Sequence, residues 1–260
     1  MTILEKITAQ TREDVNKQKQ KIAKSDFTSF PMYEKNRRSL YEALSDSESV
    51  SIIAEVKKAS PSKGLIREDF QHERIAEQYM NAGAAAISVL TDKPFFKGDA
   101  QFLTDIAAFA EVPILRKDFI IDFYQVEEAK AIGADAILLI ASILDGTQLQ
   151  ELHHAATEAG LECLVECYTE EEVHAMDYSY TRILGVNNRN LNTFEVDVHR
   201  GIRLLQTAPD NVVTVSESGL SSKADINLLL KENIHSALIG EHFMRQPDPG
   251  KALKALFEEN

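Results

Sequence analysis

The chain has 260 residues, 44% of them hydrophobic and 27% charged, so it is long enough to bury one substantial α/β core. The formal net charge of −13 argues against a nucleic-acid partner, because binding to a phosphate backbone depends on a surplus of Lys and Arg. The two cysteines cannot form a disulfide framework, and no apolar run could serve as a signal peptide or span a bilayer, so we expect a cytoplasmic protein without a membrane partner.

Residues 1–48 carry no strand pattern and are expected to form a helical extension. Thr2 and Glu5 have the spacing of a capping box, and residues 37–44 could form a second helix. About 48 residues is close to the lower limit for an independent core. We therefore expect the extension to cover one end of a barrel formed by residues 49–260, within a single domain of residues 1–260.

From residue 49 onward one pattern repeats: a short aliphatic run, a turn, an amphipathic helix and often a glycine. Possible capping boxes begin at Asp122 and Thr169, with Gln125 and Glu172 three residues later. The apolar runs are residues 51–56, 85–90, 112–117, 134–140, 161–166, 182–186, 211–216 and 236–240. Eight strand–helix units predict an α/β fold of the (β/α)8 TIM barrel class. The rival, a doubly wound open sheet, is not supported, because neither G-x-G-x-x-G nor a Walker loop is present.

Charged and amide side chains gather at the carboxyl ends of the predicted strands, where barrels of this kind build their active sites. Because side chains alternate along a strand, Glu55 and Lys57 share one face of the first strand. Glu166 of the fifth strand lies on the corresponding face. The third, sixth and seventh strands end at Lys117, Asn187 and the pair Glu217 and Ser218. One such residue alone is more often a solvated turn residue. Six of them around one mouth predict a catalytic pocket, since buried charge is costly unless it is paired or functional.

Glycines at the last two strand ends predict a phosphate site. Gly219 and Gly240 lie in the loops that bind phosphate in many barrels, where glycine lets backbone N–H groups approach an anion. The same two glycines are also compatible with ordinary turns. The long loop of residues 57–69 is rich in Ser, Pro, Lys and Gly, and we expect it to be a mobile lid.

The cysteines and histidines show no spacing typical of a metal site. Cys163 and Cys167 are expected to face the surrounding helices as small core residues, and the pair His153 and His154 to lie on the surface. We therefore expect neither a metal nor a cofactor.

Seven segments in chain order resemble the signature of the indole-3-glycerol-phosphate synthases. They are IIAEVKKASPSKG (52–64), SVLTDKPFFKG (88–98), PILRKDFIID (113–122), LVECY (164–168), GVNNRNL (185–191), SESGL (216–220) and LIGEHFM (238–244). The resemblance is specific because each segment lies at its own strand end. It implies a carbon–carbon lyase of tryptophan biosynthesis, which closes the ring of 1-(2-carboxyphenylamino)-1-deoxyribulose 5-phosphate and releases CO2 and water to give indole-3-glycerol phosphate.

The resemblance also implies residue roles. Lys117 matches the general acid that protonates the substrate carbonyl, Glu166 the acid/base group of the later proton transfers, and Lys57 the cation near the substrate carboxylate. Residues that match orienting groups are Glu55, Asn187, Glu217 and Ser218. Residues that match the substrate site are Ser60, Pro61, Phe96, Phe119, Arg189 and Leu191, and those that match the phosphate site are Gly219, Gly240 and Glu241. His242, where relatives commonly have a small residue, is assigned no role.

A lysine with the ordinary pKa of about 10.4 is a poor proton donor at neutral pH. We expect a second cation and partial desolvation to lower the pKa of Lys117, while neighbouring glutamates keep it from becoming wholly neutral. A Schiff base is also open to a lysine and a ketone, although the resemblance argues against it.

Two other functions remain open from the sequence. A related phosphosugar barrel, either an isomerase of an Amadori-type phosphoribosyl compound or a class I aldolase, would not need the aromatic residues of segments 94–96 and 117–119. A catalytically silent barrel that serves as a binding partner would not need both Lys117 and Glu166. The oligomeric state is open as well, with a monomer as the simplest expectation.

Overall fold

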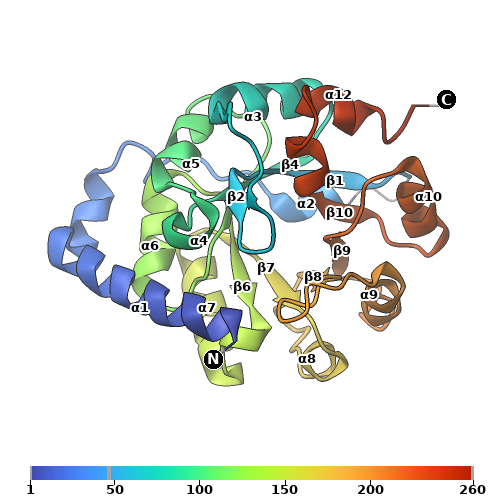
Figure 1. The fold of residues 1–260 in the computed structure, drawn as a ribbon. Coiled ribbons are helices and arrows are strands. Elements are labelled where there is room, and N and C mark those ends of the chain that lie inside the picture. Colours follow the sequence, from blue (N-terminus) through green and yellow to red (C-terminus); the bar gives the residue numbers. More distant parts are fainter. Residues whose placement is uncertain (1, 46–47, 259–260) are drawn as a thin grey trace.

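The computed structural model describes residues 2–45 and 48–258, and these contain a closed barrel of parallel strands (Figure 1). The barrel strands are β1 (Ser51–Val56), β4 (Ala86–Leu90), β5 (Ile114–Lys117), β6 (Ala136–Ile140), β7 (Glu162–Cys167), β8 (Ile183–Asn187), β9 (Val213–Glu217) and β10 (Ser236–Ile239). Neighbouring strands pair in parallel, and β10 closes the barrel on β1 with Ser51 opposite Ser236. The predicted fold class is confirmed.

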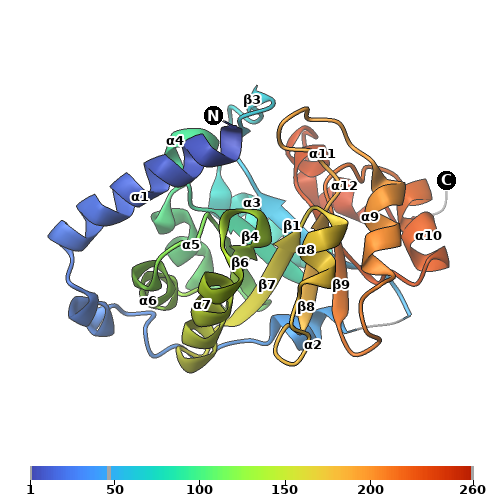
Figure 2. The same ribbon diagram turned by 90° about the horizontal axis from the view of Figure 1, so that it is seen from below.

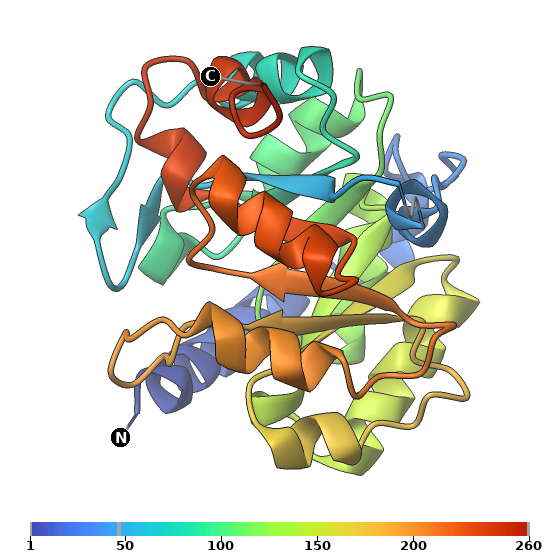
Figure 3. The ribbon, with the colours of Figure 1, turned by 90° about the vertical axis from the view of Figure 1, so that its right-hand side faces the viewer.

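Helices alternate with the strands and lie outside the barrel, as the orange and red helices in Figure 3 illustrate. They are α3 (His72–Asn81), α5 (Ala100–Ala107), α6 (Phe123–Ile132), α7 (Gly146–Glu158), α8 (Glu170–His174), α9 (Val198–Leu205), α10 (Lys223–Lys231) and α12 (Pro249–Lys254). Shorter elements in the connections are the hairpin β2 (Ala59–Ser60) and β3 (Gly64–Leu65), α4 (Lys93–Phe96), η2 (Ala141–Ile143) and α11 (Glu241–Met244). Within residues 2–45 and 48–258, no helix is long and apolar enough to cross a membrane.

Side-chain alternation along the strands divides the apolar core into two layers. Ile53 of β1 and Leu164 of β7 pack inside the barrel, whereas Ile52 packs in the layer between strands and helices. Cys163 and Cys167 lie in that outer layer, as predicted. Toward the carboxyl ends of β1 and β7, the inward face therefore continues from apolar side chains to glutamates.

The N-terminal segment covers both ends of the barrel, so the prediction that it covers one end is wrong. Helix α1 (Ile3–Lys21) lies at the end that also carries β3 and α11, and α2 (Leu40–Leu44) lies at the opposite end (Figure 2). Leu40 and Leu44 pack with the apolar residues of the barrel interior. Between the two helices, η1 (Lys24–Ser29) packs against α6 along the side of the barrel. The apolar side chains of a short extension are buried only because the extension is spread over the barrel.

Two of the three predicted capping boxes are present, at Thr2 and at Thr169. The third prediction, at the start of α6, is wrong. Asp122 does cap the helix by accepting from the N–H of Tyr124 at 2.9 Å. The Gln125 amide, however, bonds to the backbone of the loop that precedes the helix. Tertiary structure, and not the spacing from Asp122, therefore determines which groups the Gln125 amide bonds to.

Asp135, which is fully buried at the start of β6, ties the extension to the barrel. Its carboxylate accepts from the backbone N–H and the guanidinium of Arg38, both at 3.0 Å, and from the N–H of Ile114 at 2.9 Å. The Lys35 ammonium lies 3.7 Å away. Burial, opposed by the Asp135 charge, lowers the pKa of Lys35 to about 8. The buried carboxylate is thus stabilised by partners on both the extension and the barrel.

We predict that Asp135→Ala lowers the free energy of unfolding by about 3–5 kcal/mol, because it removes one partner of a buried ion pair. Asp145→Ala serves as the control, since it removes only the exposed N-cap side chain of α7 and should cost about 1 kcal/mol. Urea unfolding followed by circular dichroism measures both losses. Equal losses would contradict the role assigned to Asp135.

Candidate active site

A pocket at the carboxyl end of the barrel is lined by every residue that the sequence assigned to the site. These residues are Glu55, Lys57, Ser60, Pro61, Phe96, Lys117, Phe119, Glu166, Asn187, Arg189, Leu191, Glu217, Ser218, Gly219, Gly240 and Glu241. The structure therefore brings together side chains that lie up to 186 positions apart in the chain, between Glu55 and Glu241.

Helix α1 adds an apolar side of the pocket that was not predicted from the sequence. Ile3, Leu4 and Ile7 line the pocket together with Leu138 and Ile140 of β6. Nothing in the sequence indicated what this helix would contact. The extension thus contributes directly to the site.

Lys117, the last residue of β5, contacts two buried carboxylates. Its Nζ atom lies 2.9 Å from Glu166 Oε2 and 2.6 Å from Glu217 Oε2. Asn187, at the end of β8, lies within 3.5 Å of the other Glu166 oxygen and can donate to it. Lys57 forms a separate ion pair with Glu55. Two cation–carboxylate groups therefore share the base of the pocket.

The pKa of Lys117 is raised, so the expected lowering is wrong. Burial alone would lower this pKa, but the charges of Glu166, Glu217 and Glu55 outweigh burial and raise it well above its ordinary value. The other lysine of the site, Lys57, is itself paired with Glu55. Lys117 is therefore a charged hydrogen-bond donor that can release a proton only to a strongly basic atom.

The two glutamates beside Lys117 differ in their affinity for protons. Burial, together with the charge of Glu166 and against that of Lys117, raises the pKa of Glu217 to about 8. Burial alone would raise the pKa of Glu166. The charge of Lys117 and hydrogen bonds outweigh burial, so this pKa is lowered. At neutral pH the pair thus holds one proton, on Glu217, while Glu166 is ionised. Two carboxyls separated in this way by their surroundings form a typical acid and base pair.

Two glycines make room for the buried carboxylates. A Cβ atom at Gly185 would collide with Glu217 Oε1, and one at Gly240 would collide with Glu55 Oε2. Gly240 was predicted from a different argument, the approach of backbone to phosphate. Gly185 was not predicted, because its segment resembles an ordinary buried strand and gives no signal for a carboxylate on the neighbouring strand.

Glu241 engages cations at the rim of the pocket. Its carboxylate lies 3.3 Å from Arg189 Nη2, 3.1 Å from Arg245 Nε and 3.9 Å from Lys63 Nζ. A carboxylate repels a phosphate dianion, so a phosphate contact at this residue would come from its backbone N–H. Gly219, on the neighbouring loop, has a φ of 82°, in the left-handed region that favours glycine.

An aromatic wall lies on the β4 and β5 side of the pocket. The ring centroids of Phe96 and Phe119 are 6.0 Å apart, and Phe119 is buried. Phe96 lies in α4, which Asp92 caps by accepting from the N–H groups of Phe95 and Phe96 at 2.8 and 3.0 Å. The loop expected to act as a lid contains the β2–β3 hairpin, and its Ser60 and Pro61 face the same pocket.

The histidine pair in α7 is divided between core and surface. His154 is exposed, whereas His153 is buried and burial lowers its pKa to about 4, so its predicted surface position is wrong. Across the described part of the chain, no group of three or more His, Cys, Asp or Glu residues is arranged to hold a metal ion.

Known proteins resemble this chain in both sequence and fold. Residues 4–256 match the family model for indole-3-glycerol phosphate synthase. A relative of that name from Salinibacter ruber is 50% identical, with 100% of this chain and 96% of the relative covered. Another, from Rhodopirellula baltica, is 43% identical over 98% of this chain and 99% of its own length. A mutant tryptophan synthase alpha-subunit from Pyrococcus furiosus has a TM-score of 0.61 at 18% identity, over 80% of this chain and 98% of that chain, which shows the fold alone.

We predict that Glu217→Gln reduces the loss of stability as the pH rises toward about 8. Folded protein keeps the Glu217 proton up to about pH 8, whereas an unfolded chain loses it near 4.5. The stabilising contribution of the protonated group is therefore complete below 4.5 and is lost as the pH rises through 8. Gln has the same size and does not titrate, so the variant should gain stability relative to the wild type by up to about 1.4 kcal/mol per pH unit in this window.

Urea titrations at several pH values within that window measure the difference. The free-energy difference between variant and wild type should change steadily with pH. Two parallel curves would show that Glu217 does not hold the proton.

Proposed function

This chain belongs to the indole-3-glycerol phosphate synthase family, and we propose that its pocket performs the ring closure, decarboxylation and dehydration that yield indole-3-glycerol phosphate in tryptophan biosynthesis. The observation that carries the proposal is the contact of Lys117 with Glu166 and Glu217 beside an aromatic wall. A charged acid, an ionised base and a site for a flat ring are the groups that this chemistry needs.

The substrate is proposed to lie across the pocket, with its aromatic ring against the apolar side chains and its phosphate at the opposite rim. The ring would pack against Phe96 and Phe119, with Pro61 and Leu191 also lining the pocket. Lys57 would attract the ring carboxylate. The phosphate would lie at the backbone N–H groups near Gly219 and Gly240.

Ring closure begins when the ring carbon that bears the carboxylate attacks the ribulose ketone. The carbon–oxygen double bond opens, and its oxygen becomes an alkoxide as the new carbon–carbon bond forms. Lys117 donates a proton to this oxygen, which is basic enough to take it despite the raised pKa of the lysine. The Glu217 proton, on a carboxyl 2.6 Å from Lys117 Nζ, can then replace the one that was lost.

The two remaining steps remove CO2 and water. Loss of CO2 leaves its electron pair in the ring system, and loss of the new hydroxyl as water then requires a proton on that oxygen and removal of a proton from the ring system. Glu166, whose pKa is lowered and which is therefore ionised, is the proposed acceptor of that proton. Lys57 is proposed to share in the dehydration as a nearby cation, while Glu55, Asn187 and Ser218 orient the reacting groups.

The alternative functions fit the site less well. A class I aldolase needs a neutral lysine to form a Schiff base, whereas the charges of Glu166 and Glu55 favour the charged form of Lys117. A phosphosugar isomerase has no need for the wall of Phe96 and Phe119. A silent barrel has no need for a partly buried Lys117 paired with Glu166.

We also propose that residues 1–260 form one domain, with residues 1–48 as an extension of the barrel at 49–260. Supporting this, α1 lines the pocket and α2 fills the opposite end of the barrel. A cytoplasmic monomer without a nucleic-acid partner is the corresponding proposal for the whole protein. The net charge of −13 supports the absence of a nucleic-acid partner, and the two free, buried cysteines support a cytoplasmic location.

We predict that Lys117→Ala lowers turnover by at least about 10²-fold, the usual scale for loss of a general acid. Purified protein is mixed with substrate alone, and indole fluorescence reports the product. Lys231→Ala, an exposed lysine at the end of α10, is the control and should keep wild-type turnover. Circular dichroism checks that both variants fold.

Survival of turnover in Lys117→Ala would remove Lys117 as the acid. If the wild type forms product only when a metal or nucleotide is added, the proposed function itself is wrong.

We predict that kcat/KM of the wild type falls as the pH rises through about 8, because the protonated form of Glu217 is the active one. In Glu217→Gln, kcat/KM should no longer fall in this pH range, so this limb of the pH profile should be absent. Profiles of Lys57→Ala and Lys117→Ala, measured beside these, assign any further limbs to the two lysines. A limb near pH 8 that persists in Glu217→Gln would contradict the assignment.

A further inference from the structure

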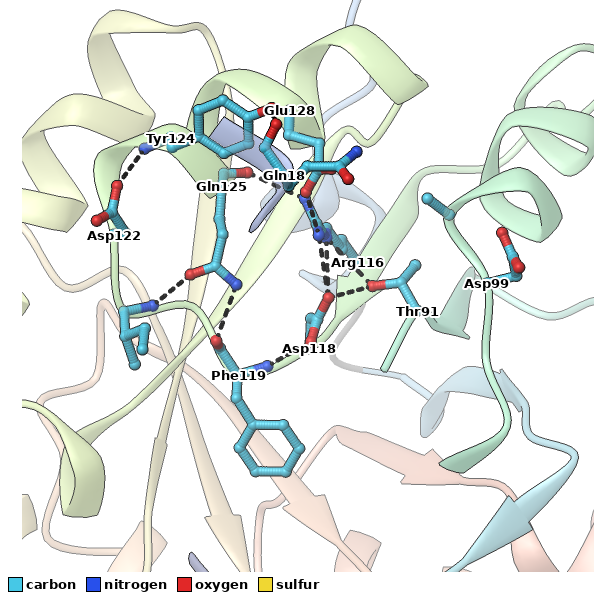
Figure 4. A network of polar contacts seen from close by, with 12 residues as sticks. Gln18, Thr91, Asp99, Arg116, Asp118, Phe119, Asp122, Tyr124, Gln125 and Glu128 are labelled. Carbon is cyan, nitrogen blue, oxygen red and sulfur yellow. Dashed lines mark hydrogen bonds and ion pairs between the residues drawn. The ribbon is translucent and has the colours of Figure 1, made fainter. Parts of the chain in front are cut away.

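A buried polar network lies behind the aromatic wall, on the outer side of β5 (Figure 4). Arg116 precedes Lys117 in the strand, so its side chain points away from the pocket, and it is only 4% exposed. Its guanidinium lies 3.0 Å from Asp118, 2.6 Å from Glu128 and 3.2 Å from the Thr91 hydroxyl. The proposed reaction uses none of these groups.

Arg116 also holds the first turn of α6. Its Nη1 atom donates to the carbonyl oxygen of Gln125 at 3.1 Å. Asp118, which Arg116 fixes on the other side, accepts from the backbone N–H of Phe119 at 2.8 Å. One guanidinium thus joins the strand, the following loop and the following helix.

The Gln125 side chain bonds to that loop with both ends of its amide. Its Nε2 donates to the carbonyl of Phe119 at 3.0 Å, and its Oε1 accepts from the N–H of Ile121 at 2.9 Å. Gln125 is only 3% exposed, so water has little access to replace these bonds. Both backbone polar groups of Phe119 are therefore held by side chains, the N–H by Asp118 and the carbonyl by Gln125.

We propose that Gln125, supported by Arg116, is a positioning residue that sets where the Phe119 ring meets the aromatic ring of the substrate. The proposal rests on the proposed function, in which Phe119 is part of the substrate wall. The side chain must carry both a donor and an acceptor, because one end donates to Phe119 while the other accepts from Ile121. A side chain of the same length without these groups leaves the loop free to shift.

Gln125→Met keeps the length of the side chain and removes both hydrogen bonds. We expect KM to rise about tenfold with kcat changed much less, since a small misplacement of a substrate-binding group weakens productive binding. A merely structural role would lower the fraction of folded protein and hence the apparent kcat, and it would leave KM unchanged.

Gln148→Met is the matched control. Gln148 of α7 donates to the carbonyl of Ile121 at 2.9 Å, so it supports the same loop without bonding to Phe119. KM of this variant should stay within about twofold of the wild type. An equal rise of KM in both Met variants would overturn the proposal, because general loosening of the loop would then explain it.

A double-mutant cycle with Phe119→Ala separates the failure of this proposal from failure of the proposed function. If Gln125 acts through Phe119, adding Gln125→Met to Phe119→Ala should raise KM no further. Unchanged KM in Phe119→Ala alone would remove the wall from the proposed function. A raised KM in Phe119→Ala, with wild-type KM in Gln125→Met, would overturn only the positioning role.

Gln125→Glu tests the same role should the Met variant fail to fold. The protonated acid has the donor and the acceptor of the amide, whereas the carboxylate has no donor for the Phe119 carbonyl. KM should therefore approach the wild-type value at low pH and rise relative to the wild type as the acid ionises. A constant ratio of the two KM values across the pH range would overturn the proposal.

Discussion

The contact of Lys117 with two buried carboxylates is the interaction on which the rest of the pocket depends. An unpaired charge at this depth would cost several kcal/mol, so the buried carboxyl groups of Glu166 and Glu217 and the partly buried ammonium group of Lys117 depend on one another. Their meeting requires the ends of β5, β7 and β9 to lie at one level. It also requires that Gly185 have no side chain, because Glu217 occupies that space. The groups that stabilise this end of the barrel are therefore the groups proposed to react.

The barrel explains why these particular strands contribute. In a TIM barrel, inward side chains form layers, and each layer takes its members from alternate strands. Around the closed sheet, β1, β5, β7 and β9 are alternate strands, and they carry Glu55, Lys117, Glu166 and Glu217. The charged groups thus form the last inward layer at the carboxyl end. The layers below them are apolar, with Ile53 and Leu164 as examples, so these layers offer the charged groups no polar partner.

Much of this arrangement could be predicted from the sequence. The eight strands follow from the repeated apolar runs, and the shared direction of Glu55 and Glu166 follows from side-chain alternation. What failed were predictions that depend on the neighbours of a residue across the fold. The pKa of Lys117 was misjudged because the number of carboxylates around it is set by strand register. The assignment of Gln125 to a capping box was wrong because its partners in the loop come from tertiary packing, which the spacing from Asp122 does not reveal. Gly185 was missed because the carboxylate that needs its space lies on the next strand.

Helix α1 influences the chemistry although Ile3, Leu4 and Ile7, its residues at the pocket, carry no charge. Burial is the largest cause of the raised pKa of Glu217. Helix α1 forms one side of the pocket that Glu217 also lines. Water in its place would solvate the carboxyl groups and lower the pKa of Glu217 toward 4.5, because burial is the main cause that raises it. The proton proposed to recharge Lys117 would then be absent at neutral pH. An apolar helix from a segment outside the barrel is thus part of the surroundings that favour the protonated form of Glu217.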